Sequence, residues 1–136
     1  MTASLGACKG LLLIIQSDDM NIPDYNLLPI SQKDFCCYCG KLIDIPKERT
    51  VEHLIPVSRG GNNHHYNKRT CCKKCNSLRG NHSLLVFIEI LKTLYAVSMN
   101  PVEKYELEIM IMNAEYWQDY VNTAEDKLLR SKVNHK

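Results

Sequence analysis

Two Cys-x-x-Cys pairs constrain this sequence more than any other feature. Cys36 and Cys39 form the first pair, and Cys72 and Cys75 form the second. This spacing places both sulfurs of a pair on one side of a tight turn, and two such turns supply the four thiolates of a structural Zn²⁺ site. A closed site of four cysteines leaves no open coordination position. We therefore expect a zinc ion that stabilises the fold rather than one that takes part in catalysis.

Three further cysteines test that interpretation. Cys37 and Cys71 lie beside the two pairs and create alternative ligand registers, whereas Cys8 stands alone. Only the pairing of 36/39 with 72/75 keeps the Cys-x-x-Cys spacing on both sides. An odd total of 7 cysteines, with no export signal, argues against a disulfide framework because cytosolic thiols are kept reduced. We expect a cytoplasmic protein.

The length of 136 residues suits one compact domain with an appended subdomain. No uninterrupted apolar segment reaches the ~18 residues that a membrane helix needs, so we expect no membrane association. The types of residue and their spacing change twice along the chain. We predict an N-terminal arm at residues 1–32, a core at 33–82 and a C-terminal helical hairpin at 83–136.

The charge is unevenly distributed. Residues 33–80 contain ten Lys or Arg and four Asp or Glu, a net charge of +6, and the remainder of the chain has a net charge of −4. A basic core is expected if its ligand is a polyanion such as a nucleic acid. A charged segment by itself is more often only a solvated face.

The sequence of the core segment, residues 33–82, predicts two strands and a short helix. Residues 49–55 carry β-branched and apolar side chains, which favours a strand that Pro56 ends. A glycine-rich loop follows, residues 68–71 can return as an antiparallel strand, and residues 72–79 predict a helix that ends at Gly80. In the N-terminal arm, residues 11–15 could form a buried strand.

The C-terminal part predicts two helices. The first covers residues 84–97, and the second begins at Asn100 as N-cap with Pro101 in the first helical position. Apolar residues recur at steps of three and four, which predicts one buried helix face: Val102, Tyr105, Ile109, Met112, Tyr116, Tyr120, Ala124 and Leu128. Four residues widen this stripe: Leu107, Met110, Ile111 and Trp117. We expect an antiparallel hairpin packed on itself and on the metal-bound unit, with a dimer interface as the alternative.

The ordered motifs resemble the HNH endonuclease family in its zinc-bearing ββα-metal form. The resemblance covers residues 35–81. It comprises the first cysteine pair, an acid followed by histidine, a Pro-x-Ser-x-Gly-Gly loop, an asparagine, and a closing Cys-x-x-Cys-Asn. Each motif alone is weak, but their order and spacing together are specific. The implied fold is α+β, with a small ββα-metal unit and its four-cysteine zinc site followed by the helical hairpin.

The resemblance implies a role for each motif residue. His53 is the general base that activates water for hydrolysis of DNA, either as a nick or as a double-strand break. Glu52 and Asn76 hold one catalytic divalent ion, Mg²⁺ or Mn²⁺, through their oxygen atoms. Asn67 fixes the loop and so orients the histidine. Six cations are candidates for contacts with DNA phosphates: Arg59, Lys68, Arg69, Lys73, Lys74 and Arg79.

Some features depart from the family pattern. Glu52 stands where Asp is commoner, and its extra methylene could alter the geometry of the metal site. Residues 52 and 53 point to opposite faces of a regular strand, so a twist or bulge is needed to bring both to one site. We interpret His64, His65 and His82 as solvent-facing loop residues.

Two other functions remain open. The first is a non-catalytic zinc module that binds nucleic acid or a partner protein through the same basic surface. The second is a nuclease delivered by a partner of the C-terminal helices, such as an ATPase of a defence or mobile-element system. A homodimer through the same helices is a further alternative.

Overall fold

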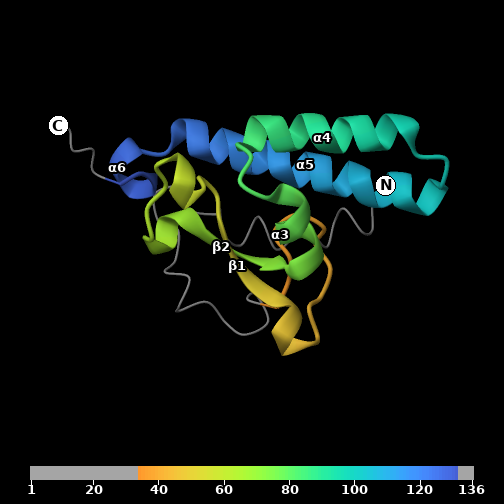
Figure 1. Ribbon diagram of the computed structural model, residues 1–136, viewed down its shortest axis with the longest axis horizontal. Helices are drawn as coiled ribbons and strands as arrows, with labels where there is room; N and C mark the ends of the chain where they lie inside the picture. The colour runs from red at the N-terminus through yellow and green to blue at the C-terminus, as the bar shows by residue number, and fades with distance from the viewer. Residues whose placement is uncertain (1–33, 132–136) are drawn as a thin grey trace.

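The computed structural model describes residues 34–131, and Figure 1 shows their arrangement. The expected strand at 11–15 and the arm at 1–32 lie outside this range. A two-stranded sheet and a short helix pack against a pair of long helices (Figure 1). The elements are η2 (Pro46–Glu48), β1 (Arg49–His53), η3 (Val57–Arg59), η4 (His65–Asn67), β2 (Lys68–Cys72), α3 (Lys73–Arg79), α4 (Leu84–Val97), α5 (Pro101–Thr123) and α6 (Asp126–Leu129).

The predicted strand, loop, strand, helix order is present. β1 and β2 pair antiparallel in a continuous register, which places Glu52 opposite Arg69 and His53 opposite Lys68. α3 follows β2 directly and ends at Gly80, whose φ of 55° is a conformation that favours glycine. β1 ends two residues before the predicted boundary of 55, because the Ile55 amide donates to the Asn67 side chain and not to a backbone carbonyl of the partner strand.

α4 and α5 form the predicted helical hairpin. Ser83 Oγ accepts a hydrogen bond from the Val86 amide at 3.2 Å, and Asn100 Oδ1 accepts from the Val102 amide at 2.8 Å. These N-caps fix both helix starts at the predicted positions. The two helices run side by side in opposite directions (Figure 1), which confirms the α+β class with a C-terminal helical hairpin.

The predicted buried stripe of the second helix is wrong in two respects. α5 ends at Thr123 and α6 follows, so the stripe to Leu128 does not lie on one helix. Its leading members are also exposed, Val102 by 66% and Met112 by 38%. The buried residues of α5 are Leu107, Ile109, Met110, Asn113, Ala114 and Trp117. Ile109 belongs to the predicted stripe, and Leu107, Met110 and Trp117 were predicted to widen it, so that part of the prediction is confirmed.

Two polar side chains on the buried face of α5 contact the cysteine-bearing turn. Asn113 Nδ2 donates to the Tyr38 carbonyl oxygen at 2.6 Å, and Trp117 Nε1 donates to the Cys37 carbonyl oxygen at 3.1 Å. Buried carbonyl groups need hydrogen-bond partners, and α5 supplies them to the cysteine-bearing turn. Apolar periodicity alone carries no information about those carbonyls.

One hydrophobic core joins the two parts of the chain. Tyr38 of the cysteine-bearing turn, Phe87 of α4 and Trp117 of α5 are fully buried in it. The predicted division at residue 82 therefore stays a prediction.

Part of the apolar surface of α4 is not covered within residues 34–131: Leu85, Val86, Leu94 and Val97. No helix in this range is long and apolar enough to cross a membrane.

Candidate active site and metal centre

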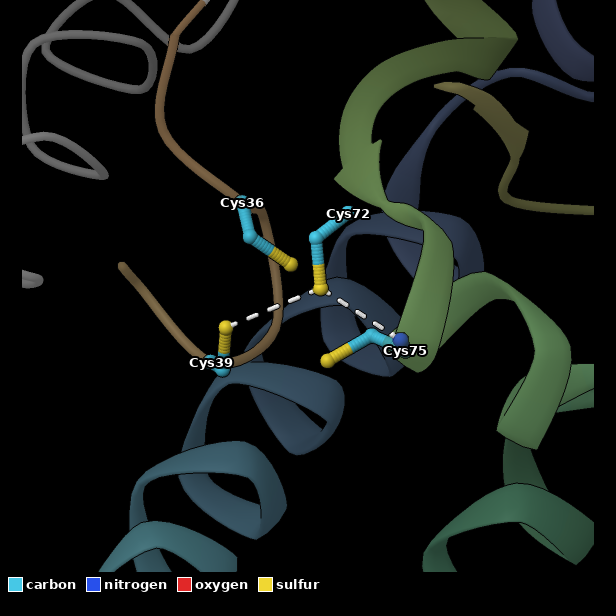
Figure 2. Close-up of side chains that lie close together, drawn as sticks. All are labelled: Cys36, Cys39, Cys72 and Cys75. Atoms are coloured by element: carbon cyan, nitrogen blue, oxygen red, sulfur yellow. Dashed lines mark hydrogen bonds between the residues drawn. The ribbon is translucent and has the colours of Figure 1, made fainter. Parts of the chain in front are cut away.

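Four cysteine sulfurs converge on one point, as Figure 2 shows. Cys36 and Cys39 come from the turn before β1, whereas Cys72 and Cys75 come from the junction of β2 and α3. Their Sγ atoms all lie within 4.8 Å of one another, and those of Cys39 and Cys72 are 4.0 Å apart. A zinc tetrahedron with bonds of ~2.3 Å has sulfur–sulfur edges of roughly 3.8 Å. The four side chains fit such an ion.

The electrostatics of the cluster favour a cation at its centre. Hydrogen bonds from neighbouring thiols, from Cys37 most of all, lower the pKa of Cys36. Hydrogen bonds with other thiols of the cluster, with Cys36 most of all, raise the pKa of Cys75. Closely spaced thiols cannot all ionise together unless positive charge lies between them. A bound metal ion would supply that charge.

The two alternative cysteines do not join the cluster. Cys37 and Cys71 are buried, with 5% and 0% of their surface exposed, but neither belongs to the four-sulfur group. That group is the only set of three or more metal-ligating His, Cys, Asp or Glu side chains within residues 34–131. His64, His65 and His82 therefore do not extend it.

The candidate base lies at the end of β1. His53 is half-buried, and its Nε2 lies 2.7 Å from the carbonyl oxygen of the Asn63 side chain. Because that oxygen can only accept, Nε2 carries the hydrogen, and a neutral ring then has its lone pair on Nδ1. Asn63 thereby selects the tautomer and holds the ring in place.

Asn67 fastens the loop that follows the histidine. It is fully buried, its Oδ1 accepts from the Ile55 amide at 2.9 Å, and its Nδ2 donates to the Ile55 and Asn62 carbonyls at 3.0 and 2.9 Å. Gly61 lies so close that a Cβ there would be 1.7 Å from the Ile55 carbonyl oxygen. Only glycine fits this approach. This geometry suits the role in loop positioning predicted for Asn67.

Glu52 points into the interior, away from His53. Its carboxylate forms an ion pair with Arg79 Nη1 and accepts a hydrogen bond from the Tyr38 hydroxyl at 2.7 Å. Glu52 is 3% exposed and Arg79 is 0% exposed. Burial raises the pKa of the Glu52 carboxyl, and the positive charge of Arg79 opposes that shift.

The guanidinium of Arg79 is fully engaged. Besides Glu52 and Tyr38, it donates to the Leu54 carbonyl at 2.8 Å and to the His82 carbonyl at 2.8 Å. The network ties β1 to the end of α3 and to the segment after it. Arg79 therefore acts inside the fold, because its donors are satisfied by protein groups.

The predicted divalent-ion ligands are not equally available. Asn76 Nδ2 donates to Thr50 Oγ1 at 2.7 Å, which leaves the amide oxygen of Asn76 for another partner. Glu52 is already neutralised by a buried cation, and no twist or bulge turns it towards the side of His53. The residues as arranged do not fit an ion held by Glu52 together with Asn76.

A stability measurement can distinguish the two roles of Glu52. In Glu52→Gln the buried guanidinium of Arg79 loses its counter-charge, and removal of one partner of a buried pair costs ~3–5 kcal/mol. We expect the free energy of unfolding, measured with denaturant, to fall by about that amount. Little loss of stability, together with a changed Mg²⁺ or Mn²⁺ requirement for cleavage, would instead identify Glu52 as an ion ligand.

The chain offers a matched control for this experiment. Lys41 and Glu106 form an ion pair at 2.7 Å, with side chains that are 59% and 32% exposed. Solvent screens such pairs, so Glu106→Gln should change the free energy of unfolding by less than ~1 kcal/mol. The double variant Glu52→Gln/Arg79→Met should lose less stability than the sum of the two single changes.

The six predicted phosphate contacts divide into two groups. Arg59, Lys73 and Lys74 are exposed and Lys68 is half-buried, so these four can be reached by a ligand. The prediction needs correction for Arg69, 4% exposed, and for Arg79, because both guanidinium groups lie in the interior. Arg69 packs 4.6 Å from the centre of the Trp117 ring.

The structure adds three site residues that the sequence did not reveal. Asn63 holds His53, Tyr38 bonds to Glu52, and Thr50 orients the amide of Asn76. The contact of Tyr38 with Glu52 depends on tertiary packing, and no motif spacing encodes it. Side chains alternate between the two faces of a strand, which does predict that Thr50 and Glu52 share a face. For Asn63 the sequence indicated only a polar residue in a loop.

A comparison with known protein families gives a match for the segment that carries this site. Residues 36–88 match the family model described as HNH endonuclease. No curated protein and no solved structure matches the chain. The matched segment contains both cysteine pairs, the Glu-His step, Asn67 and the ββα unit. Over residues 36–88 the chain is therefore similar to the HNH endonuclease family.

Proposed function

We propose that the protein is an endonuclease that hydrolyses phosphodiester bonds in DNA with the help of a divalent cation. The observation that carries the proposal is the half-buried His53 at the end of β1, held through Nε2 by Asn63. This contact leaves Nδ1 as the basic atom of the neutral ring. The match to the HNH endonuclease family supports nuclease chemistry at this residue.

In the proposed reaction His53 Nδ1 takes a proton from a water molecule. The water oxygen attacks the phosphorus, the bond from phosphorus to the 3′ oxygen breaks, and the leaving oxygen receives a proton from solvent. The products carry a 5′-phosphate and a 3′-hydroxyl. The exposed side chains of Arg59, Lys73 and Lys74 would contact neighbouring phosphates.

We propose Zn²⁺ at the four cysteines and Mg²⁺ or Mn²⁺ as the catalytic cation. A catalytic cation, when bound, stabilises negative charge on the scissile phosphate. Asn76 offers an amide oxygen for it, whereas Glu52 would first have to leave Arg79. For that reason no step of the reaction is assigned to Glu52.

A cleavage assay tests this function. Zinc-loaded protein is dialysed free of other divalent ions and incubated with supercoiled plasmid, single-stranded, duplex and branched DNA, with and without Mg²⁺ or Mn²⁺. We expect nicked or linear products only when a divalent ion is added. Absence of cleavage for every substrate, with the zinc content intact, would overturn the proposal.

A second candidate function is a non-catalytic zinc module that binds nucleic acid or a partner protein. The buried pair of Glu52 and Arg79 favours it, because this pair engages the acid assigned to the catalytic ion. This function predicts DNA binding that is unchanged by His53→Ala and no cleavage with any ion.

The setting and the partners are also proposals. Reduced thiols in a metal site suit a cytoplasmic protein. The exposed apolar side chains of α4 offer a surface for a second copy or a partner protein of a defence or mobile-element system. Sedimentation of the purified protein, alone and with candidate partners, tests that surface.

A further inference from the structure

Three aromatic rings gather on the loop that leads into β2. His64, His65 and Tyr66 are consecutive, and we call them the ring cluster. The centres of the His64 and Tyr66 rings are 5.7 Å apart with planes inclined by 9°, and the His65 ring lies 4.2 Å from that of Tyr66. His64 is exposed, and the other two are half-buried. Aromatic surfaces of this kind are those on which nucleobases stack.

Side chains of β2 and α5 hold the backbone of the ring cluster. Arg69 Nη1 donates to the Lys68 carbonyl at 2.6 Å and lies 3.4 Å from the carbonyl oxygens of His65 and Tyr66. The Tyr120 hydroxyl of α5 donates to the Tyr66 carbonyl at 3.0 Å. A platform that is ordered before binding loses less entropy when a ligand arrives, so its contacts contribute more to affinity.

The ring cluster adjoins the candidate base. Asn63, the partner of His53 Nε2 at 2.7 Å, directly precedes His64 in the chain. Lys68, two residues after the cluster, lies opposite His53 in the sheet. We therefore expect a strand whose phosphate reaches His53 to bring a neighbouring base close to the rings.

The surroundings suit a polyanion. Residues 53–88 contain no Asp or Glu, although the same segment carries six Lys or Arg side chains. Positive charge attracts either form of DNA, but only an unpaired base can offer its face to a ring. In a duplex, neighbouring bases cover both faces, and only the base edges are accessible from the grooves.

We propose that the ring cluster stacks on an unpaired nucleobase beside the scissile phosphate, so that the protein acts on single-stranded DNA in preference to intact duplex. This inference rests on the proposed function of the same site. It makes His64 a substrate-binding residue and Arg69 a positioning residue that holds the rings.

Equilibrium binding tests the inference without relying on cleavage. Labelled single-stranded DNA and the duplex of the same sequence are titrated with the His53→Ala protein at one fixed salt concentration, with fluorescence anisotropy as the readout. We expect tighter binding of the single strand. Addition of His64→Ala should weaken single-strand binding about tenfold, within the range measured for loss of one stacked base, and should leave duplex binding unchanged.

Two matched variants separate stacking from charge. His64→Phe keeps a flat ring without an imidazole and should restore single-strand binding, whereas His82→Ala removes an exposed histidine elsewhere and should change nothing. The fluorescence of a 2-aminopurine base in the bound strand should be quenched by stacking on the protein that keeps His64. It should recover on the protein that also carries His64→Ala. Equal affinity for single strand and duplex, or equal weakening of both by His64→Ala, would overturn the inference.

The two proposals can fail separately. If the wild-type protein cleaves duplex as fast as single-stranded DNA, the endonuclease function stands and the ring-cluster inference falls. If ring-dependent binding of single strands persists but no DNA is cleaved, the inference stands and the catalytic proposal falls.

Discussion

His53→Ala is expected to slow DNA cleavage by about 10²- to 10⁴-fold, the usual contribution of a positioned general base. The fold should survive, because the side chain is half-buried and makes one hydrogen bond, to Asn63, among residues 34–131. Initial rates of plasmid nicking measure the effect. Thermal unfolding and zinc content, measured on the same samples, separate loss of chemistry from loss of structure.

Two further variants serve as comparisons for the cleavage rate of His53→Ala. Asn63→Ala should lower the rate less than His53→Ala, because the imidazole remains and only its tautomer and orientation are released. His82→Ala should behave as wild type, since the structure places this exposed histidine after α3 and outside the site. A His53→Ala rate close to that of the wild type would rule out the proposed base.

Local signals in the sequence predicted the frame of the domain. The cysteine spacing, the N-cap at Asn100 and the glycine after α3 each act within a few residues. Such signals depend on short-range geometry, so the order of the elements followed from them, and the bounds of α4 followed from its apolar segment. The loop-fastening role of Asn67, which the family resemblance implies, stays a prediction, and its hydrogen bond from the Ile55 amide suits that role.

The sequence did not predict which charged side chains are buried. The motifs predicted an ion ligand at Glu52 and surface cations at Arg69 and Arg79. The helical hairpin covers one face of the sheet, and Trp117 and Phe87 pack against the two guanidinium groups. Such burial depends on contacts between residues far apart in the chain. The periodicity within one helix does not predict these contacts.

The metal centre and the candidate base depend on the same short helix. α3 has 7 residues, too few to be stable alone in water, and Cys72 and Cys75 lie at its start. Asn76 follows Cys75 directly, and Arg79 at the end of the helix bonds to the Leu54 carbonyl, one residue after His53. A change at the sulfurs therefore reaches both the predicted ion ligand and the base.

Removal of the zinc is expected to unfold the domain. Structural zinc contributes about 10–16 kcal/mol of apparent binding free energy in small zinc-finger peptides, as much as or more than the ~5–15 kcal/mol by which a whole domain is stable. We expect a strong chelator to release about one zinc per chain, with loss of helical circular dichroism and of DNA cleavage together. Cys75→Ser should reproduce this loss.

Cys37→Ala is the matched control for that prediction. Cys37 is buried like Cys36 and Cys75, with 5% of its surface exposed, but its sulfur lies outside the four-sulfur group. Loss of a small buried side chain should cost ~1–2 kcal/mol, and the zinc should stay bound. The metal centre would not be the organising element if the chelated protein melted at the same temperature as the zinc-loaded one. The ligand assignment would be wrong if Cys37→Ala released zinc as readily as Cys75→Ser.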